Sequence, residues 1–220
     1  MRTSTEVLQD KLLLLYLVSS AKKYGFMEGN LKLQKLVFLS EWQLMSANLK
    51  ALHFKYFRYR YGPFSKELLC DNEELKAGGY LTYQFNLTEK ALDFLDYAIE
   101  PIVRHGGNAE IFDKINSTCA VYSKITGVRL IERVYRMEII PYDMPGRVIK
   151  IRDIPAFIDI LVPENFASRY ALEVPAALMA DIEEEFSGKE LTQEEERAAI
   201  DRSTERLAEL IAETKSGMPN

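Results

Sequence analysis

The segment Lys11–Ala21, KLLLLYLVSSA, constrains the fold of this chain more than any other segment. Leucines recur at helical spacing over residues 8–15, and neighbouring leucines widen the apolar face beyond a single stripe. A helix with so wide an apolar face must be covered on most sides. The run is too short to span a bilayer, which takes about 20 apolar residues. We therefore predict a buried core helix that begins at a Ser4 or Thr5 cap and ends near Tyr24.

The rest of the chain alternates helical patterns with short β-prone segments. Capping residues, glycines and prolines divide it into predicted helices over residues 31–47, 66–77, 89–101, 109–117 and 121–135, with a short one near 155–161. The segments Phe54–Tyr61 and Tyr80–Thr88 are β-prone between these helices. The sequence thus predicts a mostly α, α+β fold.

The C-terminal part differs in composition from what precedes it. Between Asp181 and Lys215 there are twelve acidic and five basic residues, a net charge of −7. The pattern there predicts a surface helix with Thr192 as its N-cap and Glu195 at the capping-box position. We predict a helical domain over residues 1–165 and an acidic, helical C-terminal extension over residues 166–220, which packs on a partner or on its own domain.

The segment Phe54–Tyr61, FKYFRYRY, alternates aromatic and basic residues. Such alternation predicts a strand with two different faces, ended by Gly62-Pro63 before a helix capped by Ser65. No acidic residue occurs between Lys50 and Lys66. The segment is either a folding device, with aromatics packed inward and basic groups in water, or a surface that binds a partner.

No catalytic, cofactor-binding or metal-binding pattern emerges from the sequence. Glycine-rich phosphate-binding motifs and the GxSxG nucleophile motif are absent. The chain has two histidines, His53 and His105, without zinc-ligand spacing, and its two cysteines form no CxxC motif. We therefore predict a non-enzymatic protein without cofactor, metal or membrane association, in a reducing cytoplasm.

The order of elements over about residues 31–98 is similar to that of winged-helix domains. The Ser65-capped helix, Gly78-Gly79, a β-prone segment and the helix start Leu87–Leu95 (LTEKALDFL) resemble the second half of such a domain. This order supports the hypothesis of a DNA-binding transcriptional regulator, in which basic groups contact phosphates and aromatics stack on bases. The helix that would enter the groove carries four carboxylates, which repel phosphate, so nucleic acid is the less favoured partner.

Two motifs together resemble the Panacea domain family, which includes SocA-like antitoxins and phage-associated proteins. The first motif is Leu33-Gln34-Lys35-Leu36, within a predicted helix, and the second is Tyr61-Gly62-Pro63, which ends the aromatic segment. The likeness covers about residues 8–100 well and residues 115–165 loosely. It implies a mostly helical cytoplasmic protein that binds another protein, typically a toxin encoded beside it.

The leading hypothesis is therefore a non-enzymatic protein-interaction module, an antitoxin that neutralises a partner toxin by stoichiometric binding. Aromatic residues and arginine are the usual hot spots of protein interfaces. The predicted partner-binding residues are Tyr56, Arg58, Tyr59, Arg60 and Tyr61. The sequence leaves the oligomeric state open, a homo-oligomer included.

Overall fold

The computed structural model describes residues 2–187, 192, 194–195, 197–198 and 200–202. Over these residues the fold is mostly helical with small sheets, which confirms the predicted fold class. Its α-helices are α1 (Ser4–Tyr24), α2 (Asn30–Ser46), α3 (Lys66–Ala77), α4 (Glu89–Arg104), α5 (Asn108–Tyr122), α6 (Gly127–Tyr135) and α7 (Ala176–Glu185).

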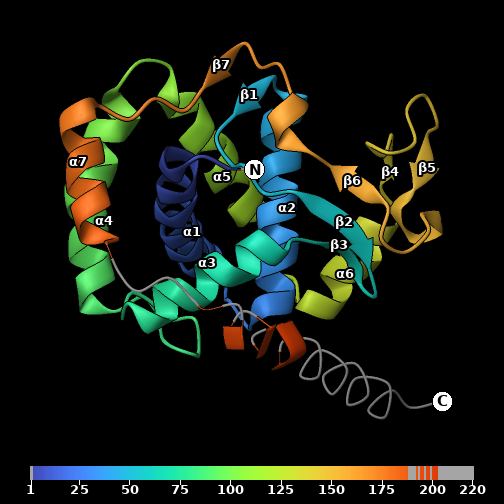
Figure 1. Ribbon diagram of the computed structural model, residues 1–220, viewed down its shortest axis with the longest axis horizontal. Coiled ribbons are helices and arrows are strands. Elements are labelled where there is room, and N and C mark those ends of the chain that lie inside the picture. Colours follow the sequence, from blue (N-terminus) through green and yellow to red (C-terminus); the bar gives the residue numbers. More distant parts are fainter. Residues whose placement is uncertain (1, 188–191, 193, 196, 199, 203–220) are drawn as a thin grey trace.

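Helix α1 lies at the centre of the helical body, with α2, α3, α4 and α5 packed around it (Figure 1). The side chains of Leu12–Leu15 are at most 1% exposed, as the wide apolar face predicted. The helix begins one residue earlier than expected, because Thr3 caps the amide of Glu6 and Glu6 bonds back to the amide of Thr3. The prediction of a buried core helix is confirmed.

The strands form short pairings along one side of the helices. The three-stranded sheet has the order β3-β2-β6, with β2 (Tyr56–Tyr59) antiparallel to both β3 (Gly62–Phe64) and β6 (Asp159–Leu161). The two-stranded sheets pair β1 (Leu49–Lys50) with β7 (Tyr170–Ala171) and β4 (Glu138–Ile139) with β5 (Ile149–Lys150). The predicted strand over Phe54–Tyr61 is therefore present as β2, shorter at both ends.

The prediction of a short helix near residues 155–161 is wrong. Residues Asp159–Leu161 form β6, and short 3₁₀ turns lie before and after it at Ile151–Asp153 and Pro163–Asn165. Strand β2 offers this segment a backbone partner more than 90 residues away in the sequence, and local propensity gives no sign of that pairing.

The local order behind the winged-helix hypothesis is present, although the wing is minimal. Ser65 caps α3, Gly78 follows its end, and Thr88 caps α4. Between the two helices the chain forms only one isolated antiparallel bridge, Leu81 to Leu87, in place of a pair of wing strands.

The fold continues past the predicted domain boundary at residue 165. Strand β7 completes a pairing with β1, and α7 lies beside α4 (Figure 1). Ile182 of α7 is fully buried, and Phe186 packs edge-on against Tyr80 and Phe94. Residues 166–186 therefore belong to the main domain, because their apolar side chains complete its core.

The predicted start of the acidic helix is confirmed at its capping box. The Thr192 hydroxyl accepts a hydrogen bond from the Glu195 amide at 3.3 Å, and the Glu195 carboxylate accepts one from the Thr192 amide at 2.8 Å. The predicted helix beyond residue 202 lies outside the described residues.

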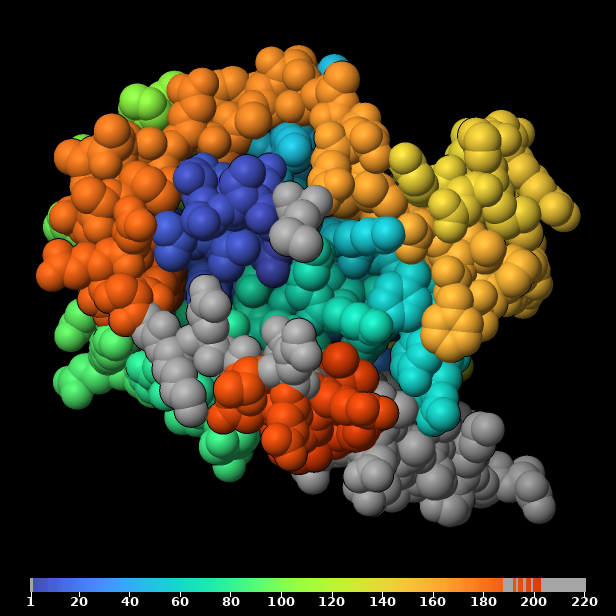
Figure 2. Space-filling view, viewed as in Figure 1, coloured from blue at the N-terminus to red at the C-terminus, as the bar shows by residue number. Residues whose placement is uncertain are grey.

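Residues 138–157 form a lobe, coloured yellow to light orange, that stands out from the helical body (Figure 2). The β2–β3 hairpin, in cyan, lies directly beside this lobe. This arrangement places the aromatic segment singled out in the sequence at the junction between the helical body and the lobe.

Candidate protein-docking surface at the β2–β3 hairpin

The two sequence motifs meet in the structure. The Gln34 side chain donates to the carbonyl oxygen of Ser65 at 2.8 Å and accepts from the Ser65 amide at 2.9 Å. The Lys35 ammonium donates to the carbonyl oxygen of Pro63 at 2.7 Å. Leu33 and Leu36 point into the core and are at most 2% exposed. The first motif thus holds the backbone that follows the second motif, so both act together as a folding device.

The hairpin turns sharply at Arg60 and Tyr61. Tyr59 pairs with Gly62, which has a φ of 98° that glycine adopts more easily than other residues. A side chain at position 62 would also meet the Tyr135 ring, since a Cβ there would lie 3.3 Å from Tyr135 Cε1. The Tyr135 hydroxyl donates to the Arg60 carbonyl oxygen at 2.8 Å, which fixes the turn against α6.

Four rings gather on one side of the hairpin, and we call this set the aromatic face: Phe57, Tyr59, Phe64 and Phe157. Phe57 lies edge-on to Phe64 at 5.7 Å and stacks with Phe157 at 6.3 Å between ring centroids. Tyr59 contacts Phe64 and Phe157 at 5.4 and 5.9 Å. These spacings are typical of favourable aromatic pairs, so the four rings support one another.

Phe157 is the most exposed member of the aromatic face. Its side chain is 71% exposed, and its φ of 67° is uncommon for a residue other than glycine. Two backbone hydrogen bonds hold this conformation: Phe157 N–H donates to Arg58 O at 2.7 Å, and Arg58 N–H donates to Ile158 O at 2.8 Å. Sequence reasoning missed Phe157, because only the pairing of β6 with β2 brings it to the hairpin.

The five predicted partner-binding residues differ in exposure. Tyr56 is fully buried against Phe38, so its assignment to a binding surface is wrong: the first residue of β2 points into the core. Arg58 is half-buried, with its Nε donating to Ile151 O and its guanidinium over the Tyr135 ring, which makes it a brace between hairpin and lobe. Tyr59 and Tyr61 are half-buried and Arg60 is exposed at the tip.

A hollow adjoins the hairpin on the α2 side. It is small, with a volume of about 20 Å³, and is lined by Leu31, Gln34, Lys35, Tyr59, Arg60, Tyr61, Gly62 and Phe64. Burial, reinforced by the nearby Arg58 charge, lowers the pKa of Lys35 to about 7. The Lys35 ammonium is turned toward Pro63, and its aliphatic chain forms part of the lining.

The surroundings of the hairpin are basic. Lys66 lies 6.0 Å from the centre of the Phe57 ring, and Arg60 lies 5.9 Å from that of Tyr59. Lys55 is paired with Asp159 at 2.5 Å. Over the residues that the structure describes, neither Arg60 nor Lys66 makes an ion pair. Two cations thus flank the aromatic face without an ion-pair partner among these residues.

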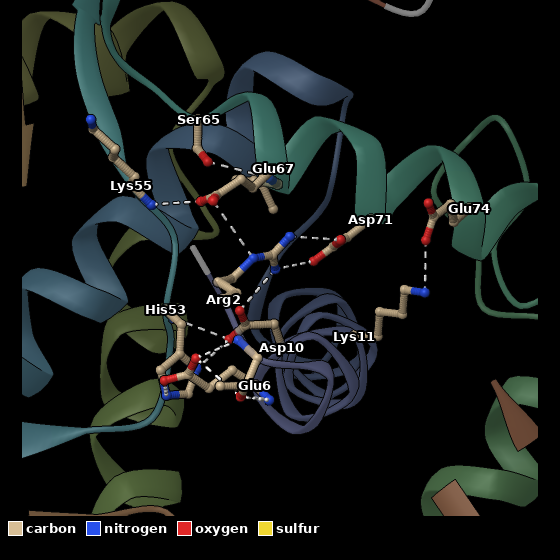
Figure 3. Close-up of polar contacts among 12 residues, drawn as sticks. Arg2, Glu6, Asp10, Lys11, His53, Lys55, Ser65, Glu67, Asp71 and Glu74 are labelled. Carbon is tan, nitrogen blue, oxygen red and sulfur yellow. Dashed lines mark hydrogen bonds and ion pairs between the residues drawn. The ribbon is translucent and has the colours of Figure 1, made fainter. Parts of the chain in front are cut away.

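The carboxylates of α3 have a different role from the one that the sequence suggested. Figure 3 shows the Arg2 guanidinium between Asp71 on α3 and Asp10 on α1, with contacts at 2.6 and 2.9 Å. Asp10 also accepts from the amide and the Nδ1 of His53 at 3.1 and 3.0 Å. Asp71 is buried, and Arg2 links it to Asp10 on α1. The side of α3 that carries Asp71 therefore packs on α1 and is not available to a DNA groove.

Glu41 and Tyr56 are buried nearby. Within the described part of the chain the Tyr56 hydroxyl makes no hydrogen bond, and the Glu41 carboxyl faces the Phe54 backbone without a well-aligned hydrogen bond. Burial, together with the charges of Asp10 and Glu67, raises the pKa of Glu41 well above its ordinary value. The group is enclosed, so it bears on stability and not on ligand binding.

Two structural features are absent from the described residues. No helix in this part of the chain combines the length and apolar character needed to cross a membrane. Among the same residues, no cluster of histidine, cysteine, aspartate and glutamate has the arrangement of a metal site. Among the described residues, the aromatic face and its adjoining hollow form the candidate site.

Comparison with known proteins gives a partial likeness. An alignment of 89 residues is 35% identical to the uncharacterized protein YwgA of Bacillus subtilis (strain 168). It covers 34% of this chain and 48% of the relative, so the chain spans about half the length of the curated relative it matches. No family model matches the chain, and no solved structure matches it significantly.

Proposed function

We propose that this chain is a non-enzymatic protein-interaction module that binds a protein partner through the aromatic face. Following the resemblance to the Panacea domain family, the partner is a toxin encoded nearby, which the module neutralises in the cytoplasm by stoichiometric binding. The observation that carries the proposal is Phe157, a ring held 71% exposed on a left-handed backbone.

An exposed aromatic ring on an unfavourable backbone does little for the stability of the chain that carries it. A left-handed conformation costs a phenylalanine of the order of 1 kcal/mol, and exposure forgoes most of the hydrophobic gain of a buried ring. At an interface the same ring gains buried area at little entropic cost, because Phe57 and Tyr59 already hold it in place. Arg60 and Lys66 supply cations at the edge.

The test is purification of the tagged chain from its native host as three proteins: wild type, Phe157→Asp and Tyr83→Asp. Tyr83 is a matched control, since it is 79% exposed and belongs to the segment between α3 and α4. We expect one protein in near-stoichiometric amount with the wild type and the control, and its loss with Phe157→Asp. That protein, expressed alone, is expected to arrest growth.

Equal recovery of the partner with all three proteins would reject the aromatic face as the binding surface. Recovery of nucleic acid that dissociates as salt is raised, with no protein partner, would favour the DNA-binding alternative. A partner that is harmless when expressed alone would leave the interaction module standing and remove the antitoxin assignment.

A further inference from the structure

The hollow beside the hairpin is lined by apolar and basic residues. Its eight lining residues contribute aliphatic and aromatic carbon, one amide and two basic side chains, Lys35 and Arg60, and no carboxylate. Both polar atoms of the Gln34 side-chain amide are hydrogen-bonded to the Ser65 backbone, and the Lys35 amino group donates to the Pro63 carbonyl oxygen. The surface left for a ligand is therefore apolar within and cationic at the Arg60 edge.

The hollow is built by contacts that keep it open. Any residue larger than glycine at position 62 would press against the Tyr135 ring, and the Tyr135 hydroxyl anchors the turn at Arg60. The bonds from Gln34 and Lys35 fix α2 relative to β3. A site that is already formed costs little ordering entropy when a ligand binds, so it suits an anchoring side chain.

We propose that this hollow takes the tip of one apolar side chain of the protein partner, and that a carboxylate next to that side chain in the partner's sequence pairs with Arg60. This inference rests on the proposed function and names the chemistry of its partner. Charge complementarity carries it, because Arg60 makes no ion pair in the described part of the chain and Lys66 adds a second cation beyond the aromatic face. An acidic segment is steered to this edge and a basic one is repelled.

The test is selection of random twelve-residue peptides, displayed on phage, against the immobilised full chain. Selected peptides are expected to share an apolar residue beside Asp or Glu. One such peptide, made synthetically with a fluorophore, is then titrated against the wild type, Arg60→Glu and Arg104→Glu. Arg104 is the matched control, since its side chain is 76% exposed on α4, on the other side of the molecule (Figure 1).

We expect Arg60→Glu to weaken binding by about tenfold or more and Arg104→Glu to leave it unchanged. Changing the peptide's carboxylate to lysine is expected to restore binding to Arg60→Glu, which a merely structural role of Arg60 would not do. Replacement of the apolar residue by alanine should cost a similar factor. On titration the amide NMR signals of Leu31, Tyr61 and Gly62 should shift.

Three results would overturn the inference: selection yields no peptides, the selected peptides lack the acidic residue, or their binding is insensitive to Arg60→Glu. The proposed function is tested separately by loss of the natural partner with Phe157→Asp. Loss of that partner combined with any of these three results would retain the interaction module and reject the anchor in the hollow.

Discussion

The side chain of Gln34 and the backbone of Ser65, 31 positions apart, form a buried pair of hydrogen bonds in both directions. A glutamine amide has the same donor and acceptor as a peptide group, so Gln34 acts like one residue of a neighbouring strand. Gln34 thereby provides hydrogen-bond partners for the N–H and C=O of Ser65, which lies between β3 and α3 and caps α3. A helix side chain thus takes the place of a sheet partner.

Gln34→Ala is expected to destabilise the chain by about 2 kcal/mol, because it leaves the buried amide of Ser65 without a partner and leaves the Ser65 carbonyl oxygen with the long bond from the Leu69 amide at 3.4 Å. The matched control is Gln43→Ala, an exposed glutamine on the same helix, with an expected change within about 0.5 kcal/mol. Urea unfolding followed by circular dichroism measures both. A loss from Gln34→Ala no greater than that of the control would mean that the pair contributes nothing net.

Arg2→Met should destabilise the chain by about 3 kcal/mol or more, because Asp10 and Asp71 would remain buried without the cation that bridges them. Adding Asp71→Asn to Arg2→Met should recover part of the loss, since one buried charge is then removed. The control Arg104→Met breaks an exposed pair with Glu100 and should change stability by less than about 0.5 kcal/mol. Thermal and urea unfolding of the four proteins form the test, and a double variant no more stable than Arg2→Met would contradict it.

Glu41→Gln is expected to make stability less dependent on pH. The folded chain holds the Glu41 proton above the ordinary pKa of 4.5, where the unfolded chain releases it, so wild-type stability falls as pH rises through that value. The variant has no proton to hold and should therefore be more stable than the wild type at pH 8, with the difference shrinking toward pH 4.5. The exposed Glu132→Gln on α6 is the control. Parallel stability curves for Glu41→Gln and wild type would show that Glu41 does not titrate as proposed.

Phe157→Asn should change the free energy of unfolding by less than about 1 kcal/mol. Asparagine tolerates a φ of 67° better than phenylalanine does, and the ring that is lost is mostly exposed. By contrast, Phe38→Ala removes a fully buried ring and should cost about 3–5 kcal/mol. Should Phe157→Asn unfold the chain as readily as Phe38→Ala does, the ring would belong to the fold and not to a docking surface.

The sequence by itself determined the helical character of this protein and the positions of most helix starts. At Ser65, Thr88 and Thr192 the side-chain oxygen accepts a hydrogen bond from the amide three residues ahead. Because each cap joins residues that are close in the sequence, the sequence alone predicts it. The sequence also predicted the burial of α1, because a helix that is apolar on most sides is stable in water only when other elements cover it. The two motifs were recognisable as well, since each is contiguous.

Only the tertiary structure decided what those residues do. Because β6 pairs with β2, a segment that was predicted to be helical is a strand, and Phe157 lies beside Phe57. The first residue of β2, Tyr56, is buried, whereas Arg60 in the turn after β2 is exposed. Arg2 holds Asp71 of α3 in the interior, against α1. Contacts between residues tens of positions apart depend on the packing of the whole chain, and no local pattern encodes which partner a strand edge or a carboxylate finds.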